Sequence, residues 1–289
     1  MSPSLAQQAR PRDQQHDVSV ALNHALLTAS GGGLHVKLGD QAILTVPEDE
    51  LFLPSPGADA LLRAASRPVP DDYAGIVIDQ SAIDWFAILQ VVARGHVDAD
   101  EMTSWTANDL IASVRDDVER DNVQRMARGE PAMEVRRWIQ PPTYDAARHQ
   151  LLWCLLIVPQ EARRDAGGEI VYNAVTFGRT GYVRLALATT VDQLPREQDI
   201  PGVVLNHIEY LPGQGFGDFQ SGKDAMDSAG LAGVFGIERI RKADFKTRVH
   251  AFAAPLVVPG GITLIVAMVG GLTVLLYRWR HVRRPMRRG

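Results

Sequence analysis

Cysteine is nearly absent from this 289-residue chain. The single residue, Cys154, excludes an intramolecular disulfide and any metal site built only from cysteine. The eight histidines are scattered and form no pair at metal-ligand spacing, and the sequence has neither a phosphate-binding loop nor a nucleophile elbow. We therefore predict no cofactor, no metal site and no catalytic residue from local motifs.

Acidic residues are missing from the C-terminal tail, residues 278–289. The tail carries six arginines, at Arg278, Arg280, Arg283, Arg284, Arg287 and Arg288. Since the whole chain has a formal charge of −4, the remainder carries −10. Affinity for nucleic acid depends on lysine and arginine contacts to phosphate, so this acidic body predicts that nucleic acid is not a partner.

Charge is also missing from residues 251–277, which predict a single transmembrane helix. From Leu256 to Tyr277 a helix would be about 33 Å long, against a hydrocarbon core of about 30 Å. The predicted anchor residues are the apolar side chains and two interfacial aromatic residues, Leu256, Ile262, Leu264, Val269, Leu272, Leu276, Tyr277 and Trp279. The lipid bilayer is accordingly the first predicted partner.

Small residues recur every four positions in the predicted span, at Thr263, Ala267 and Gly271. Such a stripe lets two helices approach closely, so self-association through the membrane is one interpretation. The alternative interpretation is the ordinary abundance of small residues in membrane helices.

The sequence gives no clear export signal. Residues 1–17 are polar, and the apolar stretch that follows is interrupted by Asn23 and His24. Basic residues flank both sides of the predicted span, so the positive-inside rule does not decide its orientation. A periplasmic domain with a cytoplasmic tail and a cytoplasmic tail-anchored domain both remain open.

The soluble part predicts one α+β domain with an antiparallel sheet and packed helices, arranged like a sandwich. Strong signals are a helix from 107 to 128, with a capping box at Thr106 and Asp109, an apolar strand at 151–158, and a hairpin at 169–189. We divide the chain into a polar, disordered segment at 1–32, the domain at 33–221, a small-residue then basic linker at 222–250, the helix at 251–277 and the tail.

Two polar residues interrupt the apolar face of the predicted helix. Leu110, Val114 and Val118 recur at four-residue spacing, and Asn122 and Arg125 continue the same face. A buried polar group without a partner costs roughly 1–3 kcal/mol, so we expect both side chains to bond backbone or carboxylate. A structural role is the favoured interpretation, and a ligand site is the alternative.

Spaced aromatic, proline and glycine residues make the chain resemble a bacterial family of predicted membrane-anchored proteins, domain of unknown function 2167. The resemblance covers about residues 33–277. Its motifs include 138–145, 95–98, 178–182 and 216–219, and its structural residues are Trp85, Gly95, Trp138, Pro142, Trp153, Gly178, Gly181, Asp218 and Phe219. The alternation of strands, with a final helix followed by a strand, also resembles the antiparallel α/β/α sandwich of photosystem and Ran-binding accessory proteins, which bears on fold only.

The family resemblance implies an exported domain with a C-terminal anchor in the inner membrane and no established activity. We expect a binding or assembly module whose partner is another membrane or envelope protein, with catalysis less expected. The alternative is an enzyme or small-ligand site assembled from six distant polar residues, Asn122, Arg125, Tyr144, Asp145, Asn173 and Arg179. Convergence of these side chains in one pocket would favour that alternative.

Overall fold

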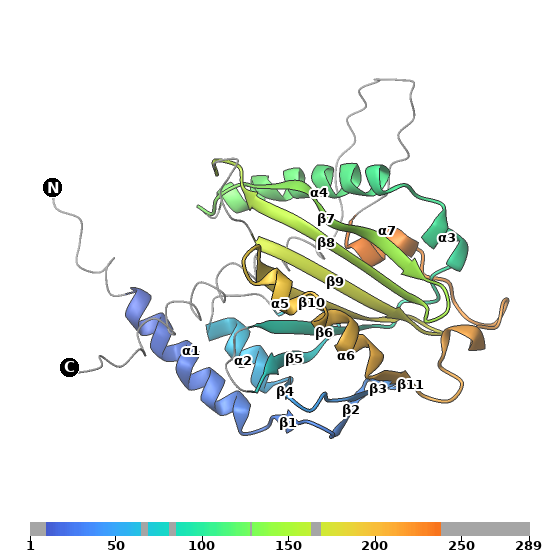
Figure 1. Ribbon diagram of the computed structural model, residues 1–289, viewed down its shortest axis with the longest axis horizontal. Coiled ribbons are helices and arrows are strands. Elements are labelled where there is room, and N and C mark those ends of the chain that lie inside the picture. The colour runs from blue at the N-terminus through green and yellow to red at the C-terminus, as the bar shows by residue number, and fades with distance from the viewer. Residues whose placement is uncertain (1–9, 65–68, 81–84, 128, 163–168, 238–289) are drawn as a thin grey trace.

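The computed structural model describes residues 10–64, 69–80, 85–127, 129–162 and 169–237. They form an α+β domain around an eight-stranded antiparallel sheet (Figure 1). In spatial order its strands are β1 (Ser30–Gly31), β4 (Glu50–Pro54), β5 (Tyr73–Asp79), β6 (Phe86–Val92), β10 (Tyr182–Thr190), β9 (Glu169–Phe177), β8 (Gln150–Pro159) and β7 (Met133–Asp145). A second sheet has the order β11 (Ile208–Tyr210), β3 (Ala42–Thr45) and β2 (His35–Leu38).

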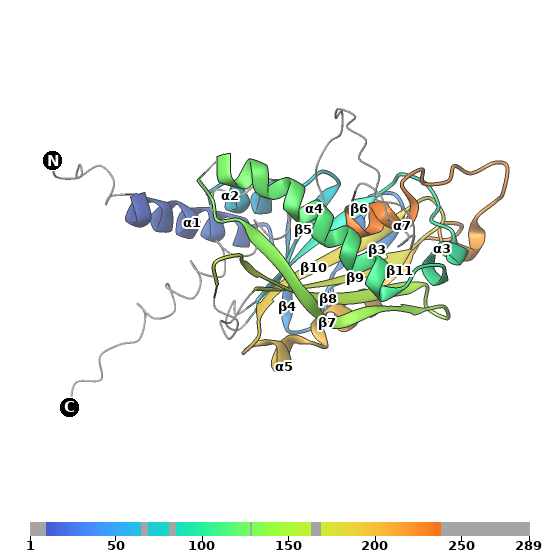
Figure 2. The same ribbon diagram turned by 90° about the horizontal axis from the view of Figure 1, so that it is seen from above.

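Seven α-helices are found in the part of the chain that the structure describes. They are α1 (Arg10–Leu26), α2 (Gly57–Ala64), α3 (Ala99–Thr103), α4 (Ala107–Ala127), α5 (Leu194–Glu197), α6 (Ile200–Asn206) and α7 (Gly230–Phe235). Figure 2 shows α1, α2 and α4 on one side of the large sheet and α5 on the other. The predicted helix, its capping box and the predicted hairpin of β9 and β10 are confirmed.

Both faces of the large sheet are buried, which explains why β8 is apolar from Leu151 to Val158. Its odd-numbered residues, such as Trp153 and Leu155, enter the core beneath the helices. Its even-numbered residues, such as Cys154 and Leu156, enter a second core beneath α6 and the small sheet. Because successive strand side chains point to opposite faces, a sheet covered twice needs continuous apolar strands.

Two predicted domain boundaries are wrong. We expected residues 1–32 to be polar and disordered, but α1 places Val18, Leu22 and Ala25 in the core at helical spacing. We expected a linker from residue 222, but α7 buries Leu231 and Phe235 beneath the sheet. Each helix buries only one short stripe of apolar side chains, and such a stripe is a weaker sequence signal for a core helix than a long apolar run.

The described residues contain no helix that is long and apolar enough to cross a bilayer. The predicted span at 251–277 and its stripe at Thr263, Ala267 and Gly271 lie outside the described residues. So does the arginine tail.

One buried carboxylate makes the fold sensitive to pH. Glu50 on β4 is 7% exposed, its Oε2 has no hydrogen-bond partner, and it pairs in register with Asp79 on β5. Burial, followed by the charges of Asp79 and Asp49, raises the pKa of Glu50 from 4.5 to about 7. The folded state therefore holds this proton more tightly than the unfolded state, and stability falls as pH rises from about 4.5 to about 7.

Replacing this charge should stabilise the protein above pH 7. We expect Glu50→Gln to raise the free energy of unfolding at pH 8 by on the order of 2 kcal/mol and to change it little at pH 4.5. Denaturation of the full-length protein at both pH values measures this, with exposed Glu48→Gln as the matched control. Equal effects of Glu50→Gln at the two pH values would contradict the assignment.

Candidate functional site

The six polar residues of the enzyme hypothesis do not meet in one pocket. Asn122 and Arg125 lie near the C-terminal end of α4, against the first residues of β7. Tyr144 and Asp145 lie at the other end of β7, roughly 30 Å further along the strand. Asn173 is buried in the middle of β9, opposite Trp153 and Ala186, and Arg179 lies in the turn between β9 and β10.

Asn122 and Arg125 bond backbone, as the favoured interpretation predicts. The Asn122 Nδ2 donates to the Met133 carbonyl at 2.8 Å, and its Oδ1 accepts from the Met133 N–H at 2.7 Å. Arg125 Nε donates to the Pro131 carbonyl at 3.0 Å. These bonds hold α4 against the start of β7.

Truncating Asn122 should destabilise the domain. Asn122→Ala leaves both backbone groups of Met133 buried without partners, so we expect a loss of about 2–4 kcal/mol in the free energy of unfolding. Denaturant titration measures the loss, and Gln124→Ala on the exposed face of α4 should cost less than about 0.5 kcal/mol. Similar values for the two variants would refute the structural role of Asn122.

Tyr144 and Asp145 order the turn that follows β7. Asp145 Oδ1 accepts from the N–H groups of Ala147 and Arg148, at 2.9 and 3.1 Å, and Arg148 Nη1 donates to Oδ2 at 2.8 Å. The hydrogen bonds from Arg148 lower the pKa of Asp145. The Tyr144 hydroxyl lies 3.3 Å from His149 Nδ1, and burial raises the pKa of Tyr144.

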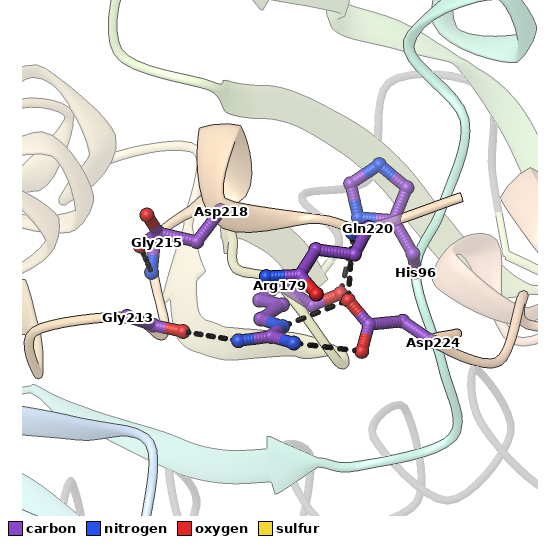
Figure 3. Close-up of polar contacts among 7 residues, drawn as sticks. All are labelled: His96, Arg179, Gly213, Gly215, Asp218, Gln220 and Asp224. Atoms are coloured by element: carbon purple, nitrogen blue, oxygen red, sulfur yellow. Dashed lines mark hydrogen bonds and ion pairs between the residues drawn. The ribbon is translucent and has the colours of Figure 1, made fainter. Parts of the chain in front are cut away.

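Arg179 forms the strongest polar contact at this end of the sheet, which Figure 3 shows. Its Nε and Nη2 donate to the two carboxylate oxygens of Asp224 at 2.8 and 2.9 Å, and its Nη1 donates to the Gly213 carbonyl at 3.1 Å. The Gln220 N–H donates to Asp224 Oδ2 at 2.7 Å. These hydrogen bonds, that from Arg179 above all, lower the pKa of Asp224 to about 2.

Four aromatic rings stack beside this ion pair. His149 and His96 contact Phe216 at centroid distances of 4.2 and 4.5 Å, and His96 stacks on Phe219 at 4.1 Å. His96 Nδ1 lies 3.2 Å from the Arg179 carbonyl. A ring of the stack is therefore in contact with the backbone of the residue that forms the ion pair. We call His96, His149, Phe216, Phe219, Arg179 and Asp224 the loop face.

A hollow of about 310 Å³ opens on the loop face. His96 is almost fully buried in its wall, whereas Phe216 and Phe219 are half-buried and Met226 is 47% exposed. Its lining includes His96, Asp98, Phe216, Phe219, Asp224 and Met226. Exposed apolar side chains around a hollow, on loops held by a rigid sheet, are typical of a binding surface. The residues that the structure describes include no group of three or more metal-ligating side chains.

The sequence did not predict the contacts of either histidine of this face, although His96 lies within the motif at 95–98. His96 and Phe216 stand 120 positions apart, and no local pattern indicates that they meet. The motif residues Asp218 and Phe219 were the available signal, and Asp218 caps its own turn by accepting from the Gly215 N–H at 2.9 Å.

The remaining motif residues support the loops and the core. Trp138 Nε1 donates to the Ala107 carbonyl at 3.0 Å, and Trp153 contacts the Phe235 ring at 4.4 Å. A Cβ on Gly95, whose φ is +124°, would lie 2.6 Å from the backbone of Met226. Two of the others are Trp85, which is buried before β6, and Pro142, which lies within edge strand β7. The last two are Gly178 and Gly181, where an added Cβ would collide with the Tyr210 ring and the Val92 carbonyl, respectively.

Fold and site together define an α+β antiparallel-sheet domain with a hollowed loop face. Residues 31–270 match the family described as protein of unknown function, DUF2167, and the chain belongs to that family. No curated protein matches the sequence.

Two solved structures resemble the chain weakly. One is cyanobacterial PsbP (CyanoP) from Synechocystis sp. PCC 6803, at 12% identity and a TM-score of 0.37, covering 63% of this chain and 91% of the other. The other is the Saccharomyces cerevisiae Ran-binding protein Mog1p, at 12% identity and a TM-score of 0.33, covering 66% and 100%. Likeness at this level carries no argument about function.

Breaking the ion pair should loosen the loop face without unfolding the sheet. We expect Asp224→Asn to accelerate amide hydrogen exchange at Arg179 and Gln220 at least tenfold, while the amides of β10 keep their protection. Between pH 4 and 8, exchange of the same amides in the unaltered protein should follow the intrinsic pH dependence of amide exchange alone. Asp224 stays ionised over this range, because its pKa is about 2. Unchanged exchange in the variant would show that Arg179 and Asp224 do not hold the loop.

Proposed function

We propose that this chain is a single-pass protein of the bacterial inner membrane whose α+β domain binds another membrane or envelope protein through the loop face. The observation that carries the proposal is the hollow beside Phe216, Phe219 and Met226, on loops fixed by Arg179 and Asp224. A rigid surface with partly exposed apolar groups favours binding of a partner, because ordering its loops costs little conformational entropy.

The positions of the six polar side chains favour a binding function over a catalytic one. The six residues of the enzyme hypothesis lie on α4, in the middle of β9 and at the end of the sheet where β7 ends and β9 turns into β10. Of these, Asn122, Arg125, Asp145 and Arg179 bond backbone or neighbouring side chains. A catalytic site needs its groups within hydrogen-bond reach of one substrate.

Membrane attachment is supported by the sequence of residues 251–277, which has the length and composition of a spanning helix followed by arginines. We place the domain in the periplasm and the tail in the cytoplasm. Attachment raises the local concentration of the domain near membrane partners. Pairing of two copies through Thr263, Ala267 and Gly271 remains part of the proposal.

Photocrosslinking in intact cells tests the loop face. We expect benzoylphenylalanine in place of Phe219 to give a discrete protein adduct, and the same group at Val203, 42% exposed on α6, to give none. Adding Asp224→Asn to the Phe219 probe should weaken the adduct. Equal adducts from both positions, or none from Phe219, would refute the loop face as the binding surface.

Topology is tested separately by protease digestion of spheroplasts that express the full chain with a C-terminal tag. A short tagged fragment that survives digestion is expected from a periplasmic domain. Full protection of the chain, with complete digestion in lysed cells, would refute the periplasmic placement and leave the crosslinking result unaffected.

A further inference from the structure

A second cavity, larger than the hollow of the loop face, lies apart from it. Its volume is about 770 Å³, within the range of ligand-binding clefts, and it lies along β2. One wall is formed by β2 and its turn, and the other by the ends of β4, β5 and β6. Its lining includes Val36, Lys37, Asp40, Gln41, Phe52 and Asp72. We call this cavity the edge groove.

The groove runs along an open strand edge. In the small sheet β2 pairs with β3 alone, and no described residue of β3 or β11 lines the groove. The groove is therefore bordered by β2, a strand that has one edge unpaired within its sheet. An edge strand presents main-chain N–H and C=O groups that an added extended segment can bond.

One polar group in the groove wall lacks a partner. Gln41 is 7% exposed, and its side-chain Oε1 accepts no hydrogen bond. Its main-chain carbonyl is occupied, because it accepts from the Leu211 N–H at 2.8 Å. Buried acceptors are nearly always satisfied in folded proteins, so an unpartnered amide oxygen in the wall of a cavity indicates a ligand that donates a hydrogen bond there.

The charges of the groove narrow the class of ligand. Asp72 is engaged by Arg94 at 3.2 Å. The other two charged residues of the lining, Lys37 and Asp40, are exposed, opposite in sign and three positions apart. A segment that pairs with the four residues of β2 spans about 13 Å and passes Lys37, and a segment that extends beyond β2 also reaches the turn that carries Asp40. The apolar floor of Val36, Phe52 and Val91 accepts apolar side chains of such a segment.

We propose that the edge groove binds an extended peptide segment that adds a strand to β2 and carries an acidic residue beside Lys37 and a basic residue beside Asp40. Main-chain bonds to β2 hold the segment, and the two charges fix its direction. This interaction does not depend on the loop face binding a partner.

The test uses fluorescent eight-residue peptides of alternating valine and threonine, with glutamate near one end and lysine near the other, and a second set with these two residues exchanged. Binding to the full-length protein is followed by fluorescence anisotropy. We expect one order to bind about fivefold more tightly than the other, because two exposed ion pairs favour it. Hydrogen exchange should slow at Val36, Lys37 and Leu38 when the preferred peptide binds, and remain unchanged in β10.

A charge exchange in the protein gives the decisive control. The double variant Lys37→Glu with Asp40→Lys changes only exposed side chains, and it should reverse the preferred order of the peptide charges. The distant exposed variant Asp192→Lys should leave the preference unchanged. A peptide methylated on alternate backbone nitrogens should lose binding, since it cannot pair with β2.

Four outcomes would overturn the proposal. They are failure of both peptide orders to bind at millimolar concentration, equal binding of the methylated peptide, exchange protection outside β2 and its turn, and a preference that the double charge exchange does not reverse. None of them bears on the crosslink from Phe219, which reports the loop face alone.

Discussion

The buried guanidinium of Arg184 holds helix α7 against the large sheet. Arg184 on β10 is 4% exposed and lies on the helix-covered face of the sheet, among apolar side chains. Its Nη2 donates to the carbonyls of Gly233 and Val234 near the end of α7. A buried cation without partners would be strongly unfavourable, so the position of Arg184 requires a group of carbonyls directly above it. The last turn of α7 supplies that group and receives a positive charge where its dipole is negative.

The other end of α7 is held by a charge of the opposite sign. Glu101 Oε2 accepts from the Leu231 N–H at 2.7 Å. At the end that Arg184 contacts, the Tyr182 hydroxyl also donates to the Gly233 carbonyl, at 3.2 Å. A six-residue helix has little stability by itself, so these contacts and the burial of Phe235 fix it. Because α7 follows directly after the loop 212–229, fixing α7 also fixes where that loop ends and helps to shape the loop face.

The parts of the fold that the sequence predicted are those specified by neighbouring residues. The capping box of Thr106 and Asp109, the hairpin of β9 and β10 and the backbone bonds of Asn122 all follow from local spacing or from the cost of burying a polar group. The role of α7 did not follow, because residues 222–250 were predicted to be a linker and not to cover the sheet. Nothing close to Arg184 in sequence shows that its partners lie about 50 positions later.

For the loop face, the sequence indicated single residues but not the contacts between them, because those contacts join residues far apart in the sequence. Arg179 was recognised as a polar residue of a glycine turn, and Phe219 as a motif residue, but Asp224 is 45 positions from Arg179. The contact between them depends on the course of the whole loop. Hydrophobic periodicity does not indicate long-range pairs of this kind. The enzyme hypothesis therefore grouped six residues that lie apart in the structure.

The turn between β9 and β10 links the loop face to the edge groove. Gly178 pairs with Gly215, the Arg179 N–H donates to the Gln214 carbonyl at 2.9 Å, and the Thr180 carbonyl accepts from the Gly95 N–H at 3.0 Å. Arg179 then holds the loop face through Asp224, whereas Thr180 and Gln214 line the edge groove. Close approach explains the glycines of this turn, because a side chain at Gly178 would displace the Tyr210 ring. The loop face and the edge groove are therefore both built on the backbone hydrogen bonds of this turn.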